Sequence, residues 1–198
     1  MTDDKKHAGN LSLLGGRSCL DFVNTLDWRG RERPKDFLRT YPDLIAWSRH
    51  AGTLSPQAAR RAEENAKSRL SKQPRALKRA IELRESLYRI FSAVAEGNGA
   101  PKFDLEKFNR FFSRTMQNSK IVDSPEGYRW DIEENPADLE WILSPVVRSA
   151  VDLLISKDLK RVKKCGDPAC GWLFLETSRN SSRLWCNMSD FGNRDKTS

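Results

Sequence analysis

Apolar residues recur at helical spacing through most of this chain. In residues 74–96 they return mostly every three or four positions, after a proline and before a glycine, which predicts a helix. Asp104 is placed to cap a further helix that carries an aromatic stripe at residues 105–116. Both stripes are typical of side chains that pack into a core.

Helix start and stop signals predict shorter helices elsewhere. Proline at the first turn and glycine past the end predict one over residues 42–52. Ser55-Pro56 begins a polar, alanine-rich helix of residues 56–70, and Ser144-Pro145 interrupts a piece that starts at Asn135-Pro136. An apolar helix of residues 145–155 follows in the core, and "CLDFVNTL" predicts a short helix near residues 20–26.

Alternating patterns are confined to short stretches. "SKIVDS" and "YRWDIE" flank Pro125-Glu126-Gly127 and predict a β-hairpin, whereas "RGRERPKD" predicts an exposed loop. The fold class is therefore α+β, with a mainly α-helical domain over residues 1–156. A composition shift after Ile155 begins a small cysteine-bearing module over residues 157–198, of zinc-ribbon or treble-clef type.

Charge favours acidic partners such as nucleic acid. The 198 residues carry a formal charge of +8 and a pI of about 9.5, although a basic surface without such a partner fits equally well. The polar side of the helix at residues 74–96 is either a phosphate-binding stripe or, as we favour, a solvated face partly neutralised by Glu82 and Glu85. Its basic residues are Arg75, Lys78, Arg79, Arg84 and Arg89.

Two features indicate a cytoplasmic location. The most apolar stretch, residues 145–155, is too short to span a bilayer, so we expect no membrane association. The N-terminal "MTDDKKHAGN" lacks the apolar region of a secretory signal.

Three of the four cysteines are spaced like metal ligands. Cys19 lies in an apolar run and is expected to be buried, whereas Cys165, Cys170 and Cys186 cluster near the end of the chain. Gly and Pro between Cys165 and Cys170 allow a knuckle that points both thiolates at one ion. We expect the segment joining Cys170 to Cys186 to form a short hairpin around a polar turn at residues 178–182.

A structural zinc site normally has four protein ligands. Repeating the spacing of Cys165 and Cys170 from Cys186 leads to Phe191, which is no ligand. Asp190 or Asp195 is an alternative oxygen ligand, water is another, and without metal the aromatic residues of the tail would form a small hydrophobic plug.

The tail resembles the CGNR zinc finger, which has two Cys-x4-Cys pairs. "CGWLFLETSRNSSRLWC" is similar to the stretch that joins the pairs, and Gly192, Asn193 and Arg194 match the last letters of the motif, with Phe191 in place of its cysteine. The preceding part is similar to the ABATE domain through "GGRSCLDFVNTLDWR", "YPDLIAWSRHAGTLS" and "LKRAIELRESLYRIF". The resemblance implies a bacterial, cytoplasmic regulator of transcription that binds DNA and zinc.

Two function classes remain open. The favoured one is a DNA-binding regulator with phosphate contacts at Lys163, Lys164, Arg179, Arg183, Arg194 and Lys196. The alternative is a ligand- or protein-binding module whose finger is a degenerate structural element. The basic helix that usually follows the motif is absent from these 198 residues, which end four residues after Arg194.

Catalysis is not expected. The chain shows no nucleophile elbow, phosphate-binding loop or dinucleotide fingerprint, and its histidines are His7 and His50. Asp21, Asn24 and Asp27 would line a site for a small-molecule effector, or else supply a cap and buried hydrogen bonds.

Overall fold

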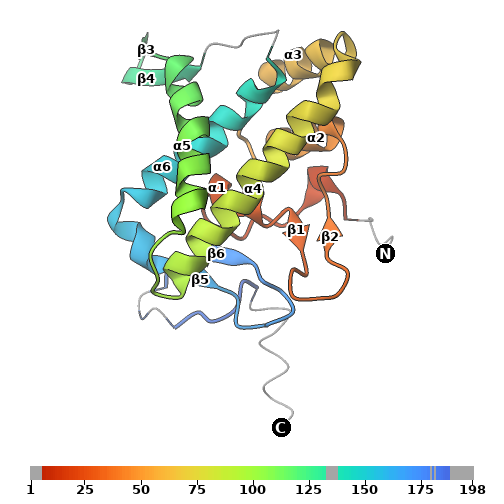
Figure 1. The fold of residues 1–198 in the computed structure, drawn as a ribbon. Helices are drawn as coiled ribbons and strands as arrows, with labels where there is room; N and C mark the ends of the chain where they lie inside the picture. Colours follow the sequence, from red (N-terminus) through yellow and green to blue (C-terminus); the bar gives the residue numbers. More distant parts are fainter. Residues whose placement is uncertain (1–5, 133–137, 179, 181, 188–198) are drawn as a thin grey trace.

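The computed structural model describes residues 6–132, 138–178, 180 and 182–187. Figure 1 shows helices packed around one another, with small strand pairs at the margins. The α-helices are α1 (Ser18–Val23), α2 (Tyr41–His50), α3 (Pro56–Lys67), α4 (Gln73–Ala95), α5 (Lys102–Gln117) and α6 (Ser144–Leu154). Short 3₁₀ helices are η1 (Ala8–Asn10), η2 (Leu70–Lys72), η3 (Leu139–Leu143) and η4 (Lys157–Arg161).

The strands form separate antiparallel pairs, so the α+β class is confirmed. They are β1 (Leu26–Asp27) with β2 (Lys35–Asp36), β3 (Ser119–Ser124) with β4 (Gly127–Ile132), and β5 (Val162–Lys164) with β6 (Leu173–Leu175). The predicted hairpin is β3–β4, in which Ile121 pairs with Trp130 and Asp123 with Tyr128. It extends from one end of α5, and β5–β6 lies toward the other end (Figure 1).

Local sequence signals explain where the helices begin. The Thr40 hydroxyl and the Asp43 carboxylate cap each other's backbone amides at the start of α2. Ser55 accepts a hydrogen bond from the Ala58 amide at the start of α3. The prediction that Asp104 caps α5 is wrong, because the helix begins at Lys102 and the Asp104 carboxylate binds Arg89.

The hydrophobic core includes the predicted apolar faces and also part of the tail. Phe22 and Trp47 pack with ring centroids 5.1 Å apart, and Cys19 is fully buried as expected. Val162, Leu173 and Leu175 belong to the same buried cluster as the helices. The tail strands therefore fold against the helical domain. No described helix is long and apolar enough to cross a membrane.

Arg84 differs most from its predicted environment. Its guanidinium was assigned to the solvated face of α4, yet the residue is 2% exposed. It makes paired hydrogen bonds of 2.7 and 2.8 Å to Asp36 and one of 2.9 Å to Glu85. A buried charge needs such partners, because removing an unpaired ion from water costs several kcal/mol, as an order of magnitude. Strand β2 supplies one of these partners, Asp36, and α4 itself supplies the other, Glu85.

Candidate metal centre

The strands β5 and β6 hold the first two cysteines close together. Cys165 directly follows β5, and Cys170 precedes β6 by two residues. The Cys165 amide donates to the Trp172 carbonyl at 2.8 Å, which closes the loop between them. Within the loop, the Asp167 carboxylate accepts from the Ala169 amide at 2.9 Å. The expected knuckle therefore forms at the turn of a hairpin.

The hairpin partner of β6 is not the one expected. The sequence predicted pairing across the polar turn at residues 178–182, but β6 pairs with β5 in the register Lys163 to Phe174. The segment beyond the turn crosses the knuckle instead, where the Leu184 carbonyl accepts from the Gly166 amide at 2.9 Å. Periodicity within the tail did not reveal this pairing, because the partner strand lies before the knuckle.

Two charged residues shape the segment that delivers Cys186. Glu176 is 1% exposed and accepts hydrogen bonds from the Ser178 and Arg183 amides. Burial would raise the pKa of Glu176, but these bonds and nearby Lys163 hold it below its usual value. The Arg183 guanidinium lies 4.4 Å from the Phe174 ring centroid and donates to the Trp185 and Cys186 carbonyls. Arg183 thus has a structural role beside its predicted phosphate contact.

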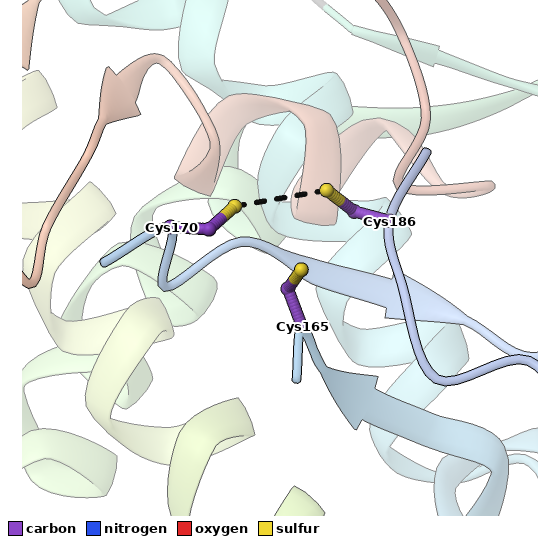
Figure 2. A group of neighbouring side chains, drawn as sticks. All are labelled: Cys165, Cys170 and Cys186. Atoms are coloured by element: carbon purple, nitrogen blue, oxygen red, sulfur yellow. Dashed lines mark hydrogen bonds between the residues drawn. The ribbon is translucent and has the colours of Figure 1, made fainter. Parts of the chain in front are cut away.

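The three predicted cysteines converge. Figure 2 shows their sulfur atoms pointing toward a common centre, with 3.6 Å between the Sγ atoms of Cys170 and Cys186. All three Sγ atoms lie within 4.8 Å of one another, and each residue is buried. A tetrahedral zinc ion with Zn–S bonds near 2.3 Å needs sulfurs about 3.8 Å apart, so the cluster has the right size.

Hydrogen bonds favour one thiolate in this cluster, at Cys165. The thiols of Cys170 and Cys186, with the backbone amides of Cys186 and Asp167, donate to Cys165 and hold its pKa well below the ordinary value. The shared interaction with Cys165 raises the pKa of the other two thiols. Zinc would be held by these three sulfurs, and as a divalent cation it would bring all of them to the thiolate form.

A fourth ligand is not present among the described residues. The His, Cys, Asp and Glu side chains of that part of the chain form no larger candidate group than the three cysteines. Phe191, Asp190 and Asp195 lie outside the described residues. The donor set therefore supplies three of the four ligands that structural zinc normally takes.

Backbone contacts fasten the knuckle to the helical domain. The Arg29 and Gly30 amides donate to the Cys170 and Ala169 carbonyls at 3.1 and 3.2 Å. A side chain at Gly30 would place its Cβ 1.9 Å from the Pro168 carbonyl oxygen, so glycine is required for this approach. Residues 30–35 of the loop predicted to be exposed are exposed, and its first two residues, Arg29 and Gly30, also hold the knuckle.

The Arg29 side chain extends this connection to α4. Its guanidinium donates to Glu85 at 2.7 and 3.1 Å and lies 3.9 Å from the Tyr88 ring centroid. Glu85 also accepts from Arg84. The cysteine loop, the loop before β2 and α4 are thus joined by one network of charged hydrogen bonds.

Asn24 makes buried hydrogen bonds, as the second interpretation of the sequence predicted, and its partner lies in the tail. Its side-chain amide both donates to the Leu173 carbonyl and accepts from the Leu173 amide, each at 2.9 Å, and the residue is buried. Asp21 accepts from the Gly15 amide at 2.8 Å, and Asp27 accepts from the Trp28 amide at 2.9 Å. The prediction that these three residues line an effector site remains a prediction, and none of them lines a described pocket.

The Asp21 carboxyl gives a testable pH dependence. Burial raises its pKa from 3.8 to about 6, against the opposing hydrogen bond from Gly15. The folded state therefore binds the proton more tightly than the unfolded state, and stability falls as pH rises from about 4 to 6, by on the order of 3 kcal/mol. We expect Asp21→Asn to flatten this dependence in denaturant unfolding, because the amide oxygen keeps the Gly15 contact.

Asp123→Asn, at an exposed position of β3, is the matched control. It should leave the parent's pH dependence intact. If the stability of Asp21→Asn falls with pH as steeply as that of the parent, the pH dependence does not come from Asp21.

The lysines predicted to contact phosphate already have ion-pair partners within the protein. Lys164 forms an ion pair with Glu96 at 3.2 Å, and Lys163 forms one with Glu176 at 3.6 Å. Arg179, Arg194 and Lys196 lie outside the described residues.

These features define a class of protein in which a helical domain is followed by a cysteine-based zinc finger. Residues 16–157 match the ABATE family, whose description is "putative stress-induced transcription regulator", and residues 161–198 match the CGNR zinc finger. The chain therefore belongs to the ABATE family, with a CGNR zinc finger after the ABATE domain. No curated protein matches the chain.

Proposed function

We propose that this protein is a cytoplasmic, non-catalytic transcription regulator that binds DNA through its finger and holds the finger together with zinc. The observation that carries the proposal is the convergence of Cys165, Cys170 and Cys186 within a chain of ABATE and CGNR architecture. Small cysteine modules of this kind use metal to replace the large core that they lack.

Charge supports nucleic acid as the partner. Residues 157–198 contain nine Lys or Arg and five Asp or Glu residues, which gives +4, half of the formal charge of the whole chain. Neutralising phosphates with such side chains releases counterions, and this release drives sequence-independent binding. Among the described candidates Lys163, Lys164 and Arg183 have protein partners, so we assign the main contacts to Arg179, Arg194 and Lys196.

The same protein partners of Lys163, Lys164 and Arg183 favour the alternative function, a ligand- or protein-binding module that does not bind DNA. Cations that already bind carboxylates or carbonyls gain less from a phosphate, and a finger docked this firmly would serve as a structural element. In that case the protein would bind a ligand or another protein and not DNA.

A salt titration separates the two. We expect a fluorescently labelled mixed-sequence DNA duplex to bind the full chain with an affinity that falls steeply between about 50 and 200 mM salt. Each neutralised phosphate contributes a slope near −0.9 in log K against log salt, so four contacts give about −4. The measurement is fluorescence anisotropy. Undetectable binding at the lowest salt would favour the alternative.

Matched double variants identify the surface. Arg194→Ala with Lys196→Ala should make the salt dependence less steep by about 2, close to one for each lost phosphate contact. Lys120→Ala with Arg129→Ala removes the same charges from the β3–β4 hairpin and should leave the slope unchanged. If both double variants change the salt dependence equally, the finger is not the surface that contacts DNA.

A further inference from the structure

A pocket lies where the start of α1 meets α6, away from the cysteine cluster in the sequence. It has a volume of about 320 Å³ and is lined by Arg17, Pro145, Arg148, Ser149 and Asp152. The Ser149 hydroxyl accepts a 3.2 Å hydrogen bond from the Cys19 amide, so α1 and α6 are joined at its base. Its volume falls at the lower end of the range for sites that take small molecules.

Arg148 and Asp152 are four residues apart on α6 and therefore share one face of the helix. The two charges attract each other, but no direct salt bridge joins them or links either one to another described residue. Opposite charges that line one pocket without a direct salt bridge are an arrangement suited to a ligand with two charges.

Arg148 is a partly buried cation. Its guanidinium lies 5.1 Å from the Trp130 ring centroid of β4. Burial lowers the pKa of Arg148, and the nearby Asp152 charge offsets this only in part. A carboxylate would supply an ion-pair partner through a charge-assisted hydrogen bond.

Asp152 is the second group that orients the ligand. The Ser149 hydroxyl lines the pocket beside Arg148, but it is engaged with Cys19, whose amide donates to its oxygen and whose sulfur accepts its proton. Asp152, one helical turn further on, accepts hydrogen bonds only. Pro145 provides an apolar wall.

We propose that this pocket binds a small zwitterion of the amino-acid class, with its carboxylate on Arg148 and its ammonium group on Asp152. The site is distinct from the finger and from Asp21, Asn24 and Asp27. This inference goes beyond the proposed function, which concerns DNA and zinc at the finger. Its test measures binding of a small molecule without DNA, so the two can fail independently.

Arg17 connects the pocket to the finger. It lines the pocket and forms a 3.0 Å ion pair with Asp158 in η4, the short helix that leads into β5. The neighbouring Gly15 carbonyl accepts from the Leu175 amide of β6 at 2.8 Å.

The test is isothermal titration calorimetry of the full chain with glycine, β-alanine and 4-aminobutanoate as probes. Propionate and propylamine, which each carry one of the two charges, are the ligand controls. We expect saturable binding of at least one zwitterion and at least about tenfold weaker binding of both controls, which corresponds to one lost ionic contact.

Arg148→Met and Asp152→Asn should each weaken the zwitterion by about tenfold or more. Arg129→Met and Asp123→Asn, at exposed positions of the hairpin, should not. Melting temperatures show whether each variant is folded, and the conservative Asp152→Asn keeps the test valid if Arg148→Met is unstable.

Three results would overturn the proposal. The first is no saturable binding of any zwitterion at about 10 mM, a concentration that detects even millimolar dissociation constants. The second is propionate binding as tightly as the zwitterions, which would indicate a simple anion site. The third is unchanged affinity in both pocket variants.

Discussion

Phe191→Cys is expected to yield a protein that binds close to one zinc ion per chain tightly, whereas the parent binds zinc more weakly. The substitution restores the Cys-x4-Cys spacing that starts at Cys186 and would supply the fourth thiolate. Loss of an outer-shell partner alone costs roughly 10–100-fold in metal affinity, and a missing ligand should cost more. Elemental analysis and competition with a chelator measure the difference.

Two further variants control for the position and number of thiols. Ser124→Cys adds a cysteine in the β3–β4 hairpin, away from the cysteine cluster, and should bind zinc as the parent does. Cys186→Ser in the Phe191→Cys background removes one converging sulfur and should lower occupancy again. Equally tight zinc in the parent and in Phe191→Cys would show that another residue already completes the site.

Arg84→Met is expected to lower the free energy of unfolding by about 3–5 kcal/mol, the usual cost of breaking a buried ion pair from one side. Asp36 would lose both of its hydrogen bonds from the guanidinium, and Glu85 would keep only Arg29. Urea unfolding followed by circular dichroism measures the loss.

Asp36→Asn combined with Arg84→Met should regain part of that stability, because the uncompensated carboxylate is removed while the Leu38 amide keeps its acceptor. Arg129→Met, at an exposed site, should stay within about 0.5 kcal/mol of the parent. A loss below about 1 kcal/mol for Arg84→Met would contradict a structural role for the network.

The network around Arg84 matters for the finger as well as for stability. Glu85 binds both Arg84 and Arg29, and the Arg29 backbone binds the Cys170 carbonyl. The backbone that carries Cys170, one of the candidate metal ligands, is therefore held by a residue whose side chain belongs to a charged network anchored in α4.

The sequence by itself determined the helices α2 to α6, the β3–β4 hairpin and the cysteine cluster, because these depend on local spacing. The first helix was placed too late, since α1 ends at Val23 and Leu26 begins β1, and the predicted start at Asn135-Pro136 lies outside the described residues. Apolar residues every three or four positions, proline at first turns and paired cysteines around a tight turn act within about twenty residues of one another. The buried state of Cys19 also followed from its apolar neighbours.

Only the tertiary structure decided which polar residues are buried and what they bind. Arg84 lies among basic residues of α4 that look alike in sequence, and its partner Asp36 is 48 positions away. Asn24 binds Leu173 across 149 positions, and β6 pairs with the strand before the knuckle. Such contacts arise when elements pack and strip water from polar groups, and periodicity along the chain carries no record of that packing.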